Sequence, residues 1–151
     1  MRGILFDKCY GISLIELMIV LIIVGVLAAL AMPMFPRAIE STKAKEAVAA
    51  LQQIRTGERI YRVEENTYFY SSGAGDLAET REINEAIRTY LDVRGKRNWD
   101  YKVEEGTTPK STFTATATRL GGGGTYENKT ITIDEAGPPY GGDWPLSLPA
   151  D

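Results

Sequence analysis

The feature that most constrains this chain is an uncharged apolar run near its N-terminus, Leu17 to Met32, which reads LMIVLIIVGVLAALAM. The wider block of residues 12–35 contains only two polar or charged side chains, Ser13 and Glu16. This block reaches about the 20 residues that a helix needs to cross a bilayer. A small head cannot bury such a helix on all sides. We therefore expect the block to lie in a membrane or in a bundle of identical helices.

The residues before this block indicate its orientation. Eleven residues precede it, and they carry Arg2 and Lys8 against Asp7. Basic residues on this side favour a cytoplasmic N-terminus. Basic residues also follow the block, but long downstream domains are translocated largely regardless of their charge. The sequence therefore predicts a single membrane segment with its N-terminus in the cytoplasm.

Composition excludes several classes of function. The 151 residues allow one ordinary domain, and they include no histidine and a single cysteine, Cys9. Catalytic triads, histidine-based acid/base chemistry and histidine or cysteine zinc sites are thereby excluded, and so is a disulfide within the chain. A net charge of −3 lacks the basic excess of a nucleic-acid-binding protein. We expect no enzyme and no nucleic-acid partner. An alternative that composition leaves open is a hydrolase that uses two close carboxylates.

Glu16 is the one charge inside the apolar block. An ionised side chain within a bilayer costs about 2.5 to 3.5 kcal/mol on insertion scales. Two interpretations follow from this cost. Either Glu16 marks the membrane interface, or it pairs with a cation that another subunit supplies inside the membrane or an assembly.

The residues around Glu16, Lys8 to Leu17 (KCYGISLIEL), closely resemble the class III signal of type IV prepilins and type II secretion pseudopilins. The resemblance implies that Gly11 ends a leader peptide of residues 1–11, which prepilin peptidase removes. Ile12 then becomes the methylated first residue, in place of the more usual phenylalanine. It also implies that Glu16 pairs with the N-terminal amine of a neighbouring subunit. Residues 12–35 would form the transmembrane and filament-core helix.

Removal of the leader would leave 140 residues without cysteine and with a net charge of −4, after loss of Arg2, Lys8 and Asp7. The resemblance further implies that the chain is a structural subunit of a filament. This filament is either a type IV pilus or a type II secretion pseudopilus, and the sequence does not distinguish the two. The subunit would wait in the bacterial inner membrane and then enter a helical homo-oligomer that is periplasmic or extracellular. Its partners would be prepilin peptidase, the inner-membrane assembly platform and that platform's ATPase.

Ordinary secretion is the alternative interpretation of this N-terminus. Ala29-Leu30-Ala31 fits the small-residue site of a secretory signal peptidase. Cleavage after Ala31 would release a soluble binding domain beginning at Met32. Glu16 argues against this interpretation, because it would interrupt the hydrophobic region of a signal peptide.

A second helical pattern follows the apolar block. Apolar residues recur at helical spacing from residue 39 to residue 61. They predict one long helix from Ile12 to about Val63. The apolar block is its first half, and an amphipathic segment is its second half. Pro33 and Pro36 lack backbone donors and should bend this helix. In filaments of similar pilins the helix loosens between a glycine and a proline placed like Gly25 and Pro33. The apolar positions of this half are Ile39, Ala47, Val48, Leu51, Ile54 and Tyr61.

The rest of residues 36–151 is expected to complete an α+β head. Ile83, Ile87, Tyr90 and Leu91 predict a short helix closed near Gly95. After that the apolar period changes from 3.6 to 2, which predicts three half-buried strands in an antiparallel meander against the long helix. The tail, residues 137–149, is proline-rich and is expected to wrap over the sheet. The alternating apolar residues are Trp99, Tyr101, Val103, Phe113, Ala115, Ala117, Ile131 and Ile133.

One weak metal site is suggested near the C-terminus. Asp134, Glu135 and Asp143 flank a glycine-rich loop, with Asp151 beyond them, and calcium prefers several oxygen ligands from such loops. The type II major pseudopilins that the chain resembles hold calcium there. The Asp-x-Asp-x-Asp-Gly spacing is missing, so solvated turn acids are the preferred interpretation and no cofactor is expected.

Overall fold

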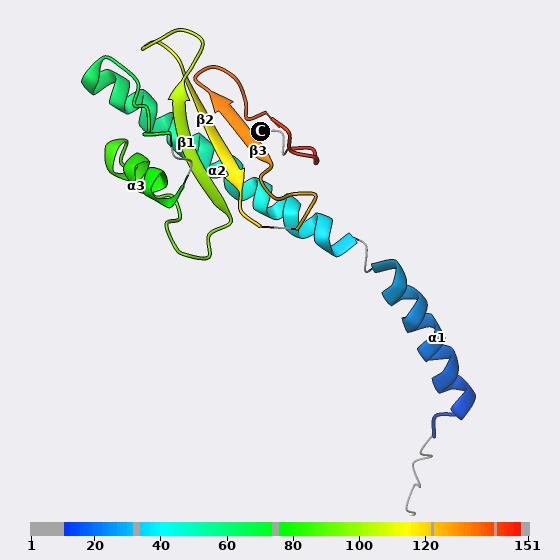
Figure 1. Ribbon diagram of the computed structural model, residues 1–151. Coiled ribbons are helices and arrows are strands. Elements are labelled where there is room, and N and C mark those ends of the chain that lie inside the picture. Colours follow the sequence, from blue (N-terminus) through cyan, green and yellow to red (C-terminus); the bar gives the residue numbers. More distant parts are fainter. Residues whose placement is uncertain (1–10, 32–33, 74–75, 122, 141, 149–151) are drawn as a thin grey trace, which may run out of the picture. The chain divides into compact units, whose positions relative to one another are not determined.

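The computed structural model describes residues 11–31, 34–73, 76–121, 123–140 and 142–148 (Figure 1). It divides the chain into two compact units, residues 1–37 and residues 38–151. The second unit is the head, which combines helices with a three-stranded antiparallel sheet. The predicted α+β, pilin-like class is confirmed. The predicted leader residues 1–10 and the bend at Pro33 lie outside the described residues.

Two helices occupy the region predicted as one. Helix α1 spans Leu14–Ala31 and helix α2 spans Met34–Glu65. Residues 32–33 between them lie outside the described residues, so the continuity of the helix at this point stays a prediction. Pro36 does not end a helix, because it lies in the first turn of α2, where a backbone amide has no helical acceptor.

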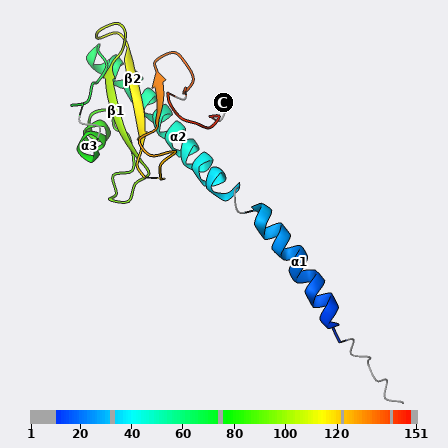
Figure 2. The same cartoon turned by 45° about the vertical axis from the view of Figure 1, so that its right-hand side comes forward.

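Helix α2 lies along one side of the sheet, as Figures 1 and 2 show, and buries one face there. Its apolar stripe is confirmed from Ala47 to Ile54, but Ile39 is half exposed at 51% and Glu40 is buried instead. The reason is register: Glu40 lies four residues before Ala44, on the same side of the helix as the core residues. The buried apolar residues of this face are Ala44, Ala47, Val48, Leu51 and Ile54.

The sheet confirms the predicted strands. Strands β1 (Trp99–Glu105), β2 (Phe113–Arg119) and β3 (Thr130–Asp134) pair in the antiparallel order β1-β2-β3. Tyr101 is opposite Ala117, and Ala117 is opposite Ile131. Every apolar residue of the predicted alternation is buried, since period-2 side chains share one face of a strand. This face and the α2 stripe form the core.

Other segments cover both edges of this sheet. On the β1 side, Ser71 N donates to Val103 O (2.9 Å) and Tyr101 N donates to Thr80 Oγ1 (3.2 Å). On the β3 side, Thr132 and Tyr140 exchange two backbone hydrogen bonds. Covered edges leave fewer free amides for pairing with other chains.

The helix predicted around residues 83–91 lies earlier in the chain. Helix α3 spans Leu77–Ala86 because Asp76 caps it, accepting hydrogen bonds from two amides of the first turn. The helix ends before Arg88, whose φ of 55° is left-handed. Leu91 is buried without being helical, because Asn84 bonds both its amide and its carbonyl. Tyr90, expected on the helix, is 95% exposed.

The structure confirms part of the prediction that the tail wraps over the sheet. Trp144 is buried and lies against Trp99 at 5.2 Å and Tyr126 at 5.6 Å between ring centroids. From α2, Arg55 donates to the carbonyls of Asp134 and Gly137. The tail is therefore held both by aromatic packing and by hydrogen bonds from the helix.

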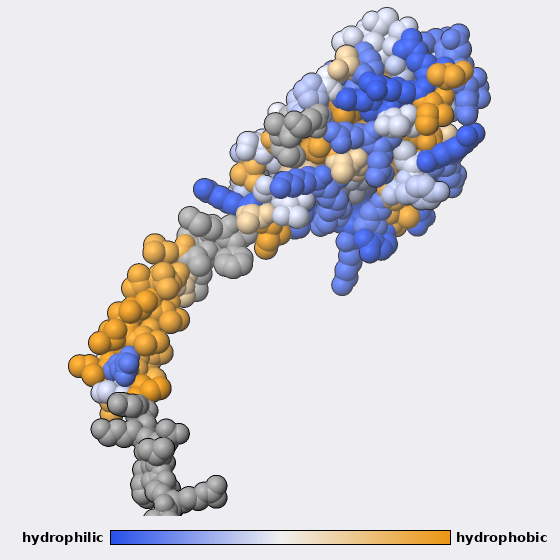
Figure 3. Space-filling view, turned by 180° about the vertical axis from the view of Figure 1, so that it is seen from behind, coloured by the Kyte–Doolittle hydropathy of each residue, from blue (hydrophilic) through white to orange (hydrophobic). Residues whose placement is uncertain are grey.

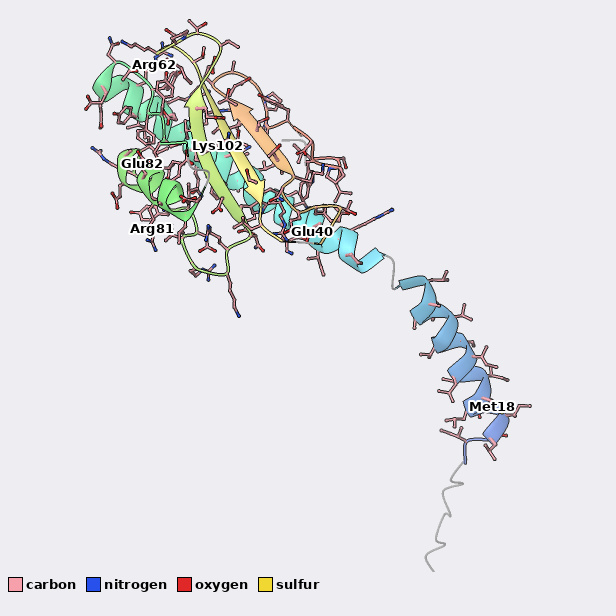
Figure 4. All side chains as sticks on the ribbon, in the orientation of Figure 1. Met18, Glu40, Arg62, Arg81, Glu82 and Lys102 are labelled. Atoms are coloured by element: carbon pink, nitrogen blue, oxygen red, sulfur yellow. The ribbon has the colours of Figure 1, made fainter. Side chains whose placement is uncertain are left out.

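A buried ion pair joins the N-terminal part of α2 to the end of β2. Arg119 donates to Glu40 through Nε (2.9 Å to Oε2) and Nη2 (3.1 Å to Oε1), and both side chains are nearly inaccessible. Arg119 Nη1 also donates to Asn98 O, 2.9 Å away. Hydrogen bonding by Arg119 lowers the pKa of Glu40 below its ordinary value, against the opposing effect of burial. Figure 4 places Glu40 toward the N-terminal end of α2.

Gly57 permits the contact between α2 and the segment that follows α3. A Cβ atom at residue 57 would lie 2.8 Å from the Ile87 carbonyl oxygen and 3.1 Å from Ile87 Cβ. Alanine in place of glycine normally stabilises a helix by about 1 kcal/mol. Here we expect Gly57→Ala to lower the free energy of unfolding by about 1 to 2 kcal/mol, because overpacking outweighs the gain in helix propensity.

Urea unfolding followed by the fluorescence of Trp99 and Trp144 measures this change. The adjacent Thr56→Ala is the control, since Thr56 is exposed and its hydroxyl donates only within α2, to Gln52 O. A change within about 0.5 kcal/mol is expected for it. Stabilisation by Gly57→Ala would show that the contact with Ile87 is loose.

Candidate processing and assembly segment

The candidate cleavage position lies just before α1. Gly11, Ile12 and Ser13 are exposed and precede the helix, whose first turn is closed by Leu17 N donating to Ser13 O at 3.1 Å. A Cβ at Gly11 would meet no described atom within 4 Å. The described part of the chain therefore does not itself require glycine at residue 11.

Glu16 lies in the first turn of α1, exposed on a surface that is otherwise apolar. A negative charge at a helix N-terminus is favoured by the helix dipole, by about 0.3 to 1 kcal/mol. Ser13 and Glu16 also have the Ser-x-x-Glu spacing of a capping box. Besides the pairing role that the prepilin resemblance implies for Glu16, this spacing predicts the start of the helix, which begins at Leu14.

Helix α1 exposes large hydrophobic side chains at successive positions, and therefore on every side of its axis. Figure 3 shows one of these sides. From Ile12 to Leu30 their exposed fractions run from 51% to 81%. A contiguous exposed apolar surface of this kind marks an interaction site with a membrane or with other protein. Within the described residues, no helix meets the length and apolarity needed for a membrane crossing.

Gly25 lies inside α1, which stays helical through it. A Cβ there would meet no described atom within 4 Å, although glycine costs a helix about 1 kcal/mol relative to alanine. The described chain thus gives no internal reason for glycine at this position. Its predicted role in flexibility, together with Pro33, stays a prediction.

The three carboxylates of the suggested metal site have separate partners. Asp143 accepts hydrogen bonds from the amide and hydroxyl of Thr130 and from Lys129, and the Thr130 amide is the main reason that its pKa falls to about 2. Asp134 accepts hydrogen bonds from two backbone amides of the turn that follows it. Glu135 accepts a hydrogen bond from Phe113 N. Across the described ranges, no group of three or more His, Cys, Asp or Glu side chains is arranged to hold a metal. Asp151 lies outside them.

One shallow hollow of about 240 Å³ contains two carboxylates, Glu46 and Asp92. Glu46 accepts from Asn98 Nδ2, and Asp92 forms an ion pair with Arg94 at 2.9 Å. Hydrogen bonding by Arg94 lowers the pKa of Asp92 to about 2. Because Asp92 stays ionised at neutral pH, it does not provide the general acid that a two-carboxylate hydrolase needs.

Comparison with known proteins identifies the N-terminal segment. Residues 7–32 match the family model described as the prokaryotic N-terminal methylation motif. The chain therefore carries a prepilin signal of the type IV pilin or pseudopilin type. Proteins with this signal are structural subunits, and the signal implies processing by prepilin peptidase. No curated protein and no solved structure matches the chain significantly.

Proposed function

We propose that this chain is a structural subunit of a type IV pilus or of a type II secretion pseudopilus. The observation that carries the proposal is the methylation motif over residues 7–32, which includes Gly11, Ile12 and Glu16. In this proposal Gly11 ends the leader, Ile12 becomes the methylated first residue, and Glu16 recruits the next subunit. The match covers the N-terminal segment, and the α+β head is compatible with such a subunit.

The exposed surface of α1 supports this assignment physically. Its apolar side chains need a non-aqueous environment before assembly and a protein environment after it. An inner membrane followed by a bundle of identical helices supplies both environments in turn. The head needs neither, since it has its own core and covered sheet edges. A membrane-anchored precursor that is later drawn into a filament thus accounts for the contrast between α1 and the head.

Energy and positioning for assembly come from other proteins in this proposal. The chain contains no Gly-rich phosphate-binding motif followed by Lys and Ser or Thr. Prepilin peptidase would cut the leader, and an inner-membrane platform with its ATPase would move each subunit. Glu16 would be neutralised by the amine of Ile12 on a neighbouring subunit, which removes the cost of a charge among apolar helices.

The direct test is immunogold electron microscopy of surface structures sheared from native cells that overproduce the chain. An antibody against the head is used, and the assembly ATPase is deleted in the control strain. We expect labelled filaments in the parent and membrane-bound chain without filaments in the control. A chain found only as soluble protein, with unlabelled filaments in the same cells, would contradict the proposal.

A further inference from the structure

The segment 68–73, which we name the strap, lies between the end of α2 and the start of α3 and has irregular backbone. It contacts the sheet through Tyr68, whose buried ring packs against Phe113 of β2 at 4.9 Å between ring centroids, and through Ser71. The Ser71 amide donates to Val103 O (2.9 Å), and its hydroxyl accepts from Val103 N (2.8 Å). Three further backbone amides of the strap donate to carboxylates on the two neighbouring helices.

Three glutamates accept hydrogen bonds from backbone amides of the strap. Glu58 on α2 accepts from Phe69 N at 3.0 Å. On α3, Glu82 accepts from Ser72 N and Glu79 accepts from Gly73 N, each at 3.1 Å. Figure 4 shows Glu82 on α3. The attachment of the strap thus depends on acidic side chains from both helices.

Glu58 differs from the other two in its hydrogen bonding. Glu58 and Glu79 are both completely buried, but Glu79 Oε1 accepts from Ser71 Oγ and Gly73 N, whereas within the described residues Glu58 Oε1 has no hydrogen-bond partner. Burial raises its pKa to about 7, and the Phe69 amide only partly opposes this shift. A carboxylate in this position would be a buried charge with a single hydrogen bond, which is costly.

The charged and titratable groups nearby do not relieve that cost. Arg62, one turn further along α2 and labelled in Figure 4, donates to Tyr68 OH (2.7 Å). Its guanidinium lies over the Tyr68 ring, 4.7 Å from the centroid. Burial and the charges of Glu105 and Glu58 raise the pKa of Tyr70, so Tyr70 stays a neutral phenol and supplies no charge to Glu58. On the α3 side the groups that bond the strap are also acidic, Glu79 and Glu82, and they supply no cation.

We propose that the strap is a pH-sensitive element that detaches from the head as Glu58 loses its proton. Detachment lets water reach the carboxylate, so the ionised form favours the open strap and the neutral form favours the closed one. The sign follows from linkage: a carboxyl whose pKa is higher in the closed state stabilises that state at low pH and loses this effect as pH rises. The proposal concerns the head alone and does not depend on filament assembly.

Amide hydrogen exchange of the full chain in detergent micelles tests this at pH 5.5 and 8.5, with rates corrected for intrinsic exchange. A shift from the ordinary 4.5 to about 7 predicts that strap amides lose roughly 30-fold in protection over this range. They should exchange by local opening, with less protection than the amides of β2. Equal protection in the strap and in β2, or no loss with pH, would overturn the proposal.

Two variants assign the effect to Glu58. Glu58→Gln keeps the shape but cannot ionise, so its strap protection should not change with pH. Glu82→Gln changes a less buried carboxylate on α3 that bonds the same strap, and it should keep the 30-fold change. An unaltered pH response in Glu58→Gln would overturn the proposal. Carbon-13 titration of the wild-type Glu58 carboxyl gives an answer that needs no variant: a midpoint near 7 supports the proposal, and one near 4.5 contradicts it.

Discussion

Arg119→Leu is expected to lower the free energy of unfolding of the head by about 3 to 5 kcal/mol. The substitution removes two hydrogen bonds to Glu40 and those to the Asn98 and Leu120 carbonyls. Glu40 then remains buried, with Lys43 at 2.8 Å as its surviving cation. An incompletely compensated buried charge is the main source of the loss. Urea unfolding of the chain in micelles, followed by tryptophan fluorescence, measures it.

Two further variants separate charge from packing in this prediction. Arg94→Leu breaks an exposed pair with Asp92 and should lower the free energy of unfolding far less than Arg119→Leu does, because solvent screens an exposed pair. The double variant Glu40→Leu/Arg119→Leu removes both buried charges, so it should recover much of the loss. In the wild type the stabilisation of ionised Glu40 should fade as pH drops through its lowered pKa, and this fading should be absent in the double variant. A cost below about 1 kcal/mol for Arg119→Leu would contradict the prediction.

Glu16→Gln is expected to reduce incorporation of the chain into filaments by at least about 30-fold, while cleavage of the leader continues. Truncating one partner of a buried charge pair costs about 2 to 5 kcal/mol, and 2 kcal/mol corresponds to roughly 30-fold. The ratio of chain in sheared filaments to chain in membranes measures the effect. This prediction rests on the proposed pairing of Glu16 with a neighbouring amine.

The matched control is Glu65→Gln, which makes the same change at an exposed residue at the end of α2. It should leave the ratio unchanged. N-terminal sequencing of both variants keeps processing and assembly apart. If Glu16→Gln entered filaments at the wild-type level, the assembly role of Glu16 would be wrong, although the leader cleavage could still hold.

The sheet was predictable from sequence because alternation is a local property. Each of the three strands has apolar residues on one side and threonine or charge on the other, and the structure buries every one of those apolar residues. The α3 prediction failed because burial was taken as a sign of helix. Ile87 and Leu91 are buried by irregular backbone, and the capping residue Asp76 was the better signal.

The buried charges were missed for a different reason. Arg119 follows Phe113, Ala115 and Ala117 at every second residue of β2, so its side chain points to the same face of the strand. Glu40 lies on the face of α2 that packs in the core. The sequence therefore shows both as charged residues at positions where the helix or strand pattern expects an apolar one. Their pairing is not visible in the sequence, because 79 residues separate them and only the packed sheet and helix bring them together.

In the proposed function, this chain is a prepilin that is cut between Gly11 and Ile12. The intact mass and N-terminal sequence of the protein recovered from membranes of native cells test this cleavage most directly. We expect a chain that begins at Ile12 and carries one added methyl group. A chain beginning at Met32 would contradict this expectation, since ordinary secretion would then remove Glu16 and most of α1 and release the head as a soluble domain.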